Sequence, residues 1–381
     1  MLTRRLFIGA GAATAAAFSL PRMALARANT NRRFVFIIQR GAADGLSILG
    51  PTGDPLHASI RGDFDRDLRN GARLGSFFTL HPALAEAGKM YAARQALFVH
   101  AVASPYRDRS HFDGQNVLET GGSAAYQLKD GWLNRLLSLL PGDDSKALAL
   151  SDTVPMALRG SNQVSSYAPS KLAGPSEDLL QRVAAMYDPD AQLHALWSEA
   201  VATRMTAGNV DATGQNGAAI GSIAAKLLGG DSGARIAMIE TNGWDTHSGQ
   251  RGRLAAQLKN LDAIAGALKA GLGTDWADTL VIVATEFGRT VRPNGTAGTD
   301  HGEASVAMLL GGAVAGGRVI ADWPGLSTAA LYEGRDLKPT STLDSLIAGA
   351  LAQHYSLDPR RTMTTLFPAN GGAAFSQALI A

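Results

Sequence analysis

Five short stretches of the chain consist mainly of hydrophobic residues that do not alternate with polar ones. They are residues 34–38, 97–102, 235–239, 279–284 and 304–310. A strand that is buried on both faces has this pattern, because neither face needs polar side chains. The pattern therefore predicts five strands of a parallel sheet.

Segments with helical periodicity lie between and after these stretches, at residues 81–93, 111–120, 249–272 and 343–355. Pro82 suits the first turn of the first segment, and Gly121 favours the end of the second. Apolar residues recur at helical spacing in the third segment, at Leu254, Leu258, Leu261, Ile264 and Leu268. Strands that alternate with helices predict an α/β fold with a mainly parallel sheet and helices on both faces.

Residues 171–228 differ from the rest of the chain, because they are rich in alanine and are interrupted by glycine next to asparagine or glutamine. We interpret them as a helical insertion that covers one edge of the sheet. The sequence contains no repeat of fixed period and no clear linker between separate domains.

The N-terminus has the three parts of an export signal. Arg4 and Arg5 precede an apolar run at 8–20, and small residues follow at 24–28. The order is that of a twin-arginine signal peptide, which we assign to residues 1–28. The apolar run is shorter than the roughly 20 residues of a membrane span. A buried N-terminal helix is the alternative. The signal predicts the twin-arginine export machinery as a partner, a periplasmic or secreted location, and no membrane span after cleavage.

Composition and charge limit the kinds of binding site that the chain can form. The formal net charge is +2, but four arginines belong to the predicted signal, so the mature chain would have a slight acidic excess. Such a chain has no basic field for nucleic acid. It also lacks cysteine, which excludes disulfides and thiolate sites. Any metal must therefore be bound by Asp, Glu or His, which suits zinc, magnesium, calcium or manganese.

Residues that can bind metals gather in the loops next to the predicted strands, where ligands bind in open parallel sheets. The candidates are Asp44, Asp245, His247, Glu286, Asp300 and His301. Each has an alternative: a turn held by Asp44 or by Asp300, a hydrogen-bonded pair of Asp245 and His247, or a salt bridge of Glu286. If the loops converge, we predict a carboxylate and imidazole site for one or two divalent ions.

Ser110 stands where a helix is predicted to begin, and His111 follows it. A helix N-terminus stabilises anions through its free N–H groups. A serine at this position is also the usual N-cap, which is the alternative. His111, with Arg107 and Arg109 nearby, favours a functional role for this segment.

Eight short segments of the chain, in this order, resemble a bacterial family called domain of unknown function 1501. They are residues 40–46, 81–84, 110–112, 131–133, 243–247, 286–289, 298–302 and 311–317. The resemblance covers residues 32–368, which we take as one domain. Members of the family typically have a twin-arginine signal. The family is similar, more distantly, to the alkaline phosphatase and sulfatase clan, which implies an alkaline phosphatase-like fold.

The resemblance to that clan implies roles for individual residues. It places Asp44, Asp245, His247 and His301 at positions of metal ligands, and Glu286 after a strand that in the clan ends in an Asp-His pair. It places Ser110 at the position of the nucleophile. Phe287 departs from the pattern, because it cannot replace the histidine of that pair.

These expectations favour a metal-dependent hydrolase of a phosphate or sulfate ester, with a small molecule or a glycan ester as substrate. The metal would lower the pKa of Ser110 or of a water, Arg109 or Arg289 would neutralise the ester oxygens, and His111 would act as acid or base. A catalytically degenerate metal- or ligand-binding module of an exported assembly is the alternative, and Phe287 favours it. A purely structural secreted protein would leave the polar loops unexplained.

Overall fold

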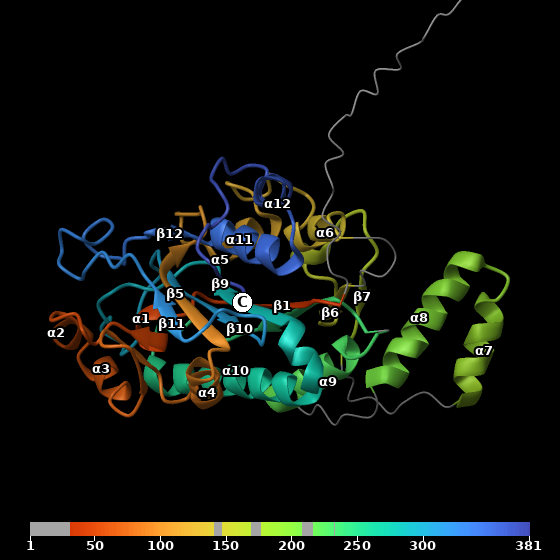
Figure 1. Cartoon of the computed structure of the whole chain (residues 1–381), viewed down its shortest axis with the longest axis horizontal. Helices are drawn as coiled ribbons and strands as arrows, with labels where there is room; N and C mark the ends of the chain where they lie inside the picture. The colour runs from red at the N-terminus through yellow and green to blue at the C-terminus, as the bar shows by residue number, and fades with distance from the viewer. Residues whose placement is uncertain (1–30, 141–146, 169–176, 208–215, 232) are drawn as a thin grey trace, which may run out of the picture.

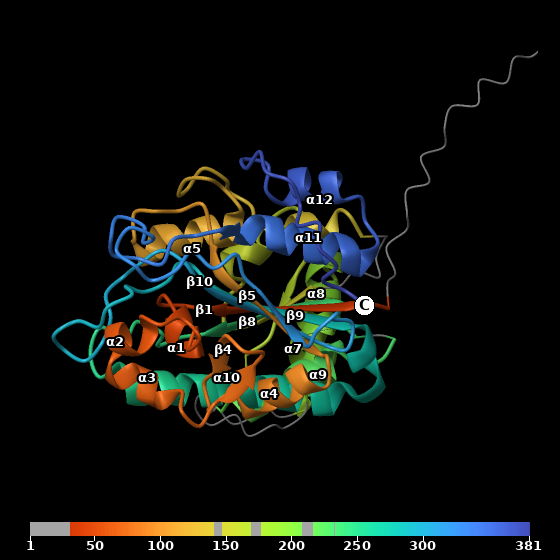
Figure 2. The same ribbon diagram turned by 60° about the vertical axis from the view of Figure 1, so that its left-hand side comes forward.

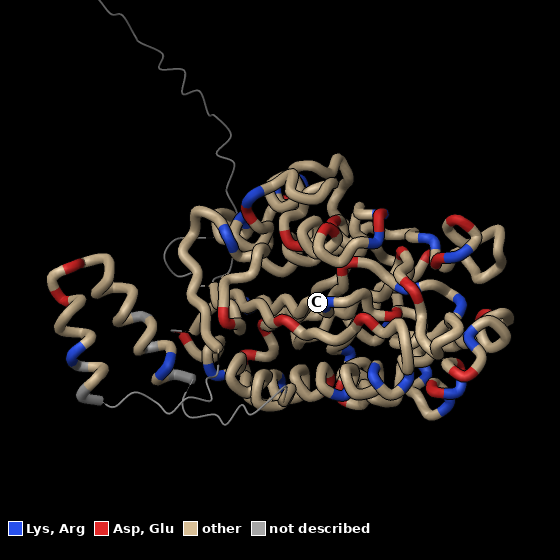
Figure 3. Tube along the Cα trace, turned by 180° about the vertical axis from the view of Figure 1, so that it is seen from behind, with Lys and Arg blue, Asp and Glu red and all other residues tan. Residues whose placement is uncertain are grey.

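The computed structural model describes residues 31–140, 147–168, 177–207, 216–231 and 233–381. The predicted signal peptide at 1–28 lies outside these residues, so export and the periplasmic or secreted location stay predictions. No helix in the described part of the chain is long and apolar enough to cross a membrane. Lys and Arg residues are interspersed with Asp and Glu residues over the molecule, as Figure 3 shows from behind.

A nine-stranded sheet forms the centre of the molecule, in the order β11-β5-β10-β9-β1-β8-β6-β7, with β12 beside β5. The strands are β1 (Arg33–Gln39), β5 (Ala96–Ala103), β6 (Ala147–Leu150), β7 (Ser165–Ser166), β8 (Ile236–Thr241), β9 (Thr279–Thr285), β10 (Ser305–Leu310), β11 (Arg318–Ile320) and β12 (Ser341–Thr342). The five strands predicted from hydrophobic runs are β1, β5, β8, β9 and β10. The predicted α/β fold with a mainly parallel sheet is confirmed.

One predicted strand runs against the others. β1 is parallel to β8 and β9, whereas β10 is antiparallel to both β9 and β5. A parallel connection needs a crossover, usually a helix, that returns the chain to the opposite edge. No helix lies between β9 and β10. The chain therefore re-enters the sheet at the edge where it left, and the loop at 286–304 stays there.

Helices cover both faces of the sheet (Figures 1 and 2). One layer contains α5 (His111–Thr120), α6 (Trp132–Leu137), α11 (Leu343–Tyr355) and α12 (Pro359–Leu366). The other contains α4 (Ala85–Ala92), α9 (Gly217–Leu228) and α10 (Gln250–Leu272). This arrangement explains the continuous apolar run of β1, since its two faces pack against different helical layers.

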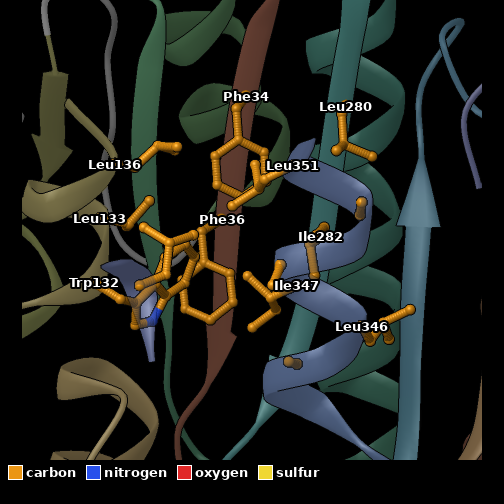
Figure 4. Close-up of a cluster of buried hydrophobic side chains, with 14 of the residues drawn as sticks. Phe34, Phe36, Trp132, Leu133, Leu136, Leu280, Ile282, Leu346, Ile347 and Leu351 are labelled. Atoms are coloured by element: carbon orange, nitrogen blue, oxygen red, sulfur yellow. The ribbon is translucent and has the colours of Figure 1, made fainter. Parts of the chain in front are cut away.

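The two cores can be followed from β1. Phe34 and Phe36 pack with Trp132 and with Ile347 of α11 (Figure 4), and Phe36 meets Trp132 edge to face with ring centroids 5.1 Å apart. Val35 and Ile37 belong instead to the core beneath α10. Residues that alternate along β1 thus divide between the two cores, as the pleat of a strand requires.

The predicted helix at 81–93 begins later than expected, at Ala85. Pro82 is therefore not in its first turn. His81 Nδ1 accepts a hydrogen bond from the N–H of Ala83, which keeps this segment as a turn. The helix starts where Asp262 of α10 accepts the N–H groups of Glu86 and Ala87. A side chain from another helix therefore provides the cap, which local sequence does not reveal.

Residues 171–228 are helical where the structure describes them, with α7 (Glu177–Tyr187), α8 (Ala191–Ala207) and α9. α7 and α8 form a hairpin at one side of the molecule (Figure 1). The third helix, α9, packs against α10 in the main helical layer.

The remaining elements are short; most of them lie between β1 and β5, and two 3-10 helices occur later in the chain. They are α1 (Gly45–Ile48), β2 (Leu49–Gly50), α2 (His57–Arg61), α3 (Asp63–Asp67), β3 (Ala72–Leu74), β4 (Phe78–Leu80) and the 3-10 helices η1 (Met156–Leu158) and η2 (Gly273–Asp278). β2, β4 and β3 form a separate three-stranded sheet. This region contains Arg61, which contacts the segment that follows β1.

Candidate metal centre

Three strand-end segments bring histidines and carboxylates to one edge of the sheet. β8, β1 and β9 are neighbours and parallel, so their carboxyl ends lie together, and β10 begins at the same edge. Asp245 and His247 follow β8, His301 precedes β10, and His111 begins α5 after β5. His111, Asp245 and His301 offer ligand atoms that all lie within 4.8 Å of one another.

Asp245 is at the centre of this group. Its Oδ1 lies 3.1 Å from His247 Nε2 and 3.5 Å from His301 Nε2. Its Oδ2 lies 3.5 Å from His111 Nε2. The Nε2 atoms of His247 and His301 are 3.0 Å apart. Three imidazoles therefore present the same ring nitrogen to one carboxylate.

The opposite nitrogen of each ring is bound by a hydrogen-bond acceptor. His111 Nδ1 lies 2.9 Å from Glu286 Oε1, and His247 Nδ1 lies 3.1 Å from Asp300 Oδ1. His301 Nδ1 lies 2.9 Å from the carbonyl oxygen of Arg109. Carboxylates and carbonyls only accept, so each Nδ1 carries a proton and donates it. In the neutral imidazole the lone pair is then on Nε2, toward Asp245.

Lone pairs that face a carboxylate need a positive charge between them. A proton on one nitrogen satisfies one close pair, whereas a cation would bind several of these groups at once, and the ligand atoms of His111, Asp245 and His301 all lie within 4.8 Å of one another. His111 Nε2 is buried and has no hydrogen-bond partner, although it points at this centre. Ligands about 2.0–2.1 Å from a tetrahedral ion lie about 3.4 Å apart, which is close to the 3.0 Å between the Nε2 atoms of His247 and His301 and the 3.5 Å between His301 Nε2 and Asp245 Oδ1. The residues present therefore fit a divalent cation.

The charges of the group also suit a cation. Burial opposes the ionisation of Asp245, but the hydrogen bond and the charge of Arg289 outweigh it and lower the pKa of Asp245. Burial and the neighbouring His111 lower the pKa of His301, so this ring stays neutral. The hydrogen bond to Glu286 raises the pKa of His111 above its ordinary value. Protons and a cation therefore compete at His111.

The structure gives Glu286 a different role from the predicted metal ligand. Glu286 is fully buried, and its Oε1 accepts from the Gly41 N–H at 2.8 Å and from Gln115 Nε2 at 3.1 Å, besides His111. Its Oε2 accepts from the hydroxyl of Thr285. These bonds leave Glu286 to orient the His111 ring, as carboxylates often do behind a metal-bound histidine. Asp300 does the same for His247, and it also accepts from Asn294 at 3.0 Å.

Asp44 also differs from its predicted role as a ligand. It is buried, and its Oδ2 accepts hydrogen bonds from Arg61, Gln250 and the Ser47 hydroxyl. Arg61 is itself fully buried and donates to the carbonyl of Val291. Asp44 therefore anchors a polar network under the loops and is not part of the group that His111, Asp245 and His301 form.

Arg289, which was expected to neutralise ester oxygens, has a wholly buried side chain that binds protein groups. It donates to the backbone carbonyls of Ala42 and Thr299, and more weakly to those of Gly41 and Trp244. Its Nη2 also lies 2.5 Å from Asp245 Oδ1. Arg289 thus holds Asp245 and joins three loops.

The side chain of Arg109 is also bound by other protein groups. Its side chain pairs with Glu303, Glu333 and Asp336. Its backbone has a φ of 60°, which is unfavourable for a residue other than glycine, and its carbonyl is the acceptor for His301. The strained backbone therefore serves to orient a candidate ligand.

Ser110 is the N-cap residue of α5, but its side chain makes no capping hydrogen bond to the helix. Its N–H donates to the hydroxyl of Tyr106 at 3.1 Å. The hydroxyl of Ser110 is thus not used for capping and stays a candidate nucleophile. Phe287 stacks on His111 with ring centroids 5.1 Å apart, so it forms a wall of the site.

The sequence did not single out Gln250, Gln115 or Asn294, whose amides support the site. The one available signal was the place of Gln250, at the start of a predicted helix and directly after the loop with Asp245 and His247. Its partners are distant in sequence, so their identity was not available from local pattern.

The chain belongs to the family described as protein of unknown function DUF1501, whose model matches residues 92–367. The predicted family is therefore confirmed. No curated protein matches the chain by sequence.

Solved structures of similar fold include two hydrolases and a periplasmic domain. Alkaline phosphatase from the Antarctic bacterium TAB5 is 11% identical, with 90% of this chain and 99% of that chain covered and a TM-score of 0.38. The C-terminal periplasmic domain of EcEptC from Escherichia coli is 10% identical, with 92% of each chain covered and a TM-score of 0.38. Phosphonate monoester hydrolase of Agrobacterium radiobacter is 11% identical, with 76% and 70% covered and a TM-score of 0.34. At this level the similarity says nothing about activity.

Proposed function

We propose that this DUF1501 chain is a metal-dependent hydrolase that acts on phosphate or sulfate esters outside the cytoplasm. Its divalent cation would be held by Asp245 and by the Nε2 atoms of His111, His247 and His301. The observation that carries the proposal is the convergence of three lone-pair nitrogens on one carboxylate, at nitrogen–oxygen separations of 3.1–3.5 Å.

A divalent cation in such a site polarises an ester oxygen and lowers the pKa of a bound water. The residues of the chain support this chemistry. Arg289 holds Asp245 in place, while Glu286 keeps the proton of His111 on Nδ1 and so its Nε2 free. The side chains of Asp245 and His247 are each 45% exposed, which leaves an open side for a substrate. Ser110, beside His111 at the start of α5, is the candidate nucleophile if the attacking group is not a water.

A second candidate is a metal-binding module without catalytic activity. The observation that favours it is the engagement of Arg289 and Arg109 with protein groups, because both were expected to neutralise the ester oxygens. In that case the cation would organise the loops or bind a ligand, and no ester would be cleaved.

Hydrolysis assays separate the two candidates. We expect the protein loaded with zinc, manganese, magnesium or calcium to cleave at least one of 4-nitrophenyl phosphate, bis(4-nitrophenyl) phosphate and 4-nitrophenyl sulfate. Chelation, or the His301→Ala substitution, should lower the rate by about 100-fold or more, because the cation provides most of the charge stabilisation. Ser110→Ala would retain the activity if a water attacks. A stoichiometric metal without cleavage of any of the three esters would favour the binding module.

The titration of His111 provides a test of its orientation by Glu286. The pKa of His111 is raised by that hydrogen bond, so in the metal-free protein the pair stabilises the fold at low pH. This contribution is complete below the ordinary pKa of histidine, near 6.5, and is lost as the pH rises through the raised pKa. The opposite holds for the metal, whose affinity should rise over the same interval as the proton leaves.

We therefore expect Glu286→Gln, which keeps the shape but removes the charge, to lower the pKa of His111 in the metal-free protein. Titration of the His111 ring protons by NMR measures this value. Asp300→Asn is the matched control, because Asp300 bonds His247 and not His111. An unchanged titration of His111 in Glu286→Gln would contradict the assigned orientation.

A further inference from the structure

Two loops that are far apart in sequence supply neighbouring ligand atoms of the candidate metal centre. Asp245 and His247 lie in the first, at 242–249, and His301 ends the second, at 294–301. The loops are in close contact, since a Cβ added at Gly298 would lie 2.2 Å from the carbonyl of His247. The separation of the His247 and His301 nitrogens therefore depends on how these loops are held together.

One amide side chain connects both loops. Gln250, the first residue of α10, is 1% exposed. Its Oε1 accepts hydrogen bonds from the hydroxyl of Thr246 at 3.0 Å and from that of Thr299 at 2.6 Å. Thr246 lies between Asp245 and His247 in the chain, and Thr299 lies two residues before His301. A single oxygen thus fixes both segments at a common distance.

The orientation of this amide follows from its partners. The Nε2 of Gln250 donates to Asp44 Oδ2, and a carboxylate cannot donate in return. The Oε1 is then left for the two threonine hydroxyls. Both threonines are fully buried, so bulk water does not compete for these hydrogen bonds. Asp44 is in turn held by Arg61 and Ser47, which makes it a fixed anchor for the amide.

We infer that Gln250 is a positioning residue, which sets the distance between His247 and His301 and thereby the affinity and geometry of the metal centre. The inference rests on the proposed function, because it assumes that these histidines bind a cation. The inference also gives Asp44 a role. Asp44 was predicted to bind the metal, but it binds the amide of Gln250, which sets the distance between two of the proposed ligands.

Cobalt(II) is a suitable probe, because its visible absorption reports the coordination geometry directly. We expect Gln250→Met, which has a similar volume but no hydrogen bonds, to weaken cobalt binding by about 10–100-fold, as loss of an outer partner of a metal site typically does. The absorption band should also change in shape. Gln250→Glu should have an effect in the same direction, because its carboxylate would face Asp44 and lose the donor.

Two further variants separate positioning from general stability. Thr299→Val removes one of the two hydroxyl donors, so we expect it to lose less cobalt affinity than Gln250→Met. It replaces Gln250→Met as the test if that variant fails to fold. Asp262→Asn is the matched control on the same helix: it weakens a buried cap of α4, which does not contact the metal loops. Asp262→Asn should lower the melting temperature but leave the cobalt affinity and the visible absorption spectrum of bound cobalt unchanged.

The outcomes distinguish the inference from the proposed function. If the wild-type protein binds no cobalt, the proposed metal centre is overturned, and so is the inference about Gln250, which depends on it. If the wild type binds cobalt and folded Gln250→Met or Thr299→Val binds it with the same affinity and spectrum, the inference alone is overturned. An equal loss in Asp262→Asn would also overturn it, because the effect would then follow stability.

Discussion

Asp245→Asn is expected to abolish the stoichiometric divalent ion that the wild-type protein should contain. Among the described residues, Asp245 is the carboxylate that the Nε2 atoms of all three histidines face, and its Oδ1 and Oδ2 are both directed at the centre. The amide keeps the shape of the side chain but removes the negative charge, so we expect affinity to fall by at least about 100-fold. Elemental mass spectrometry of gel-filtered protein measures the content.

Asp300→Asn is the control for this experiment. Asp300 does not face the centre but accepts a hydrogen bond from His247 Nδ1, so its loss should weaken metal binding by only about 10–100-fold. Full metal content in folded Asp245→Asn would contradict the ligand set. No metal in the wild-type protein would contradict the centre itself.

Arg289→Met is expected to lower the free energy of unfolding by at least about 3 kcal/mol. The substitution leaves buried carbonyl groups of Ala42 and Thr299 without donors, and each such group costs about 1–3 kcal/mol. It also releases Asp245, whose pKa should rise toward its ordinary value once the guanidinium is gone. Chemical denaturation of the metal-free protein measures the change in stability.

Arg251→Met is the matched control, because Arg251 pairs with Asp67 at the surface, where salt bridges contribute at most about 1 kcal/mol. If Arg289 instead neutralised the ester oxygens, Arg289→Met would lose hydrolysis without a change in stability. That result would restore the predicted catalytic role of Arg289.

Hydrophobic pattern was sufficient to locate the main strands but not their directions. A run such as 304–310 is buried on both faces whether it runs with or against its neighbours, so its sequence does not record its direction. The direction of β10 follows from the lack of a helix after β9. The start of α4 was also beyond local sequence, because its cap comes from Asp262 on another helix.

The structure brings some of the candidate site residues together and gives others different partners. Strand-end position and residue type together selected Asp245, His247 and His301 as candidate ligands. The helix start selected His111 as a candidate acid or base, whereas the proposed centre uses it as a ligand. The same criteria selected Asp44, which is bound by Ser47 and Arg61, and Glu286 and Asp300, which each bind a histidine of the group. A carboxylate has the same sequence signature whether it binds a metal or a side chain that does, so spacing alone could not separate these roles.

The sequence by itself determined the α/β class, the family, the order of the main strands along the chain and the edge where polar loops gather. These follow from periodicity and motif order, which are properties of consecutive residues. Only the tertiary structure decided which groups meet: Asp44 with Arg61, Arg289 with Asp245, and Gln250 with the loops at 242–249 and 294–301. The role of a charged or polar side chain depends on the partner that satisfies its hydrogen bonds after burial, and folding brings that partner from a distant part of the chain.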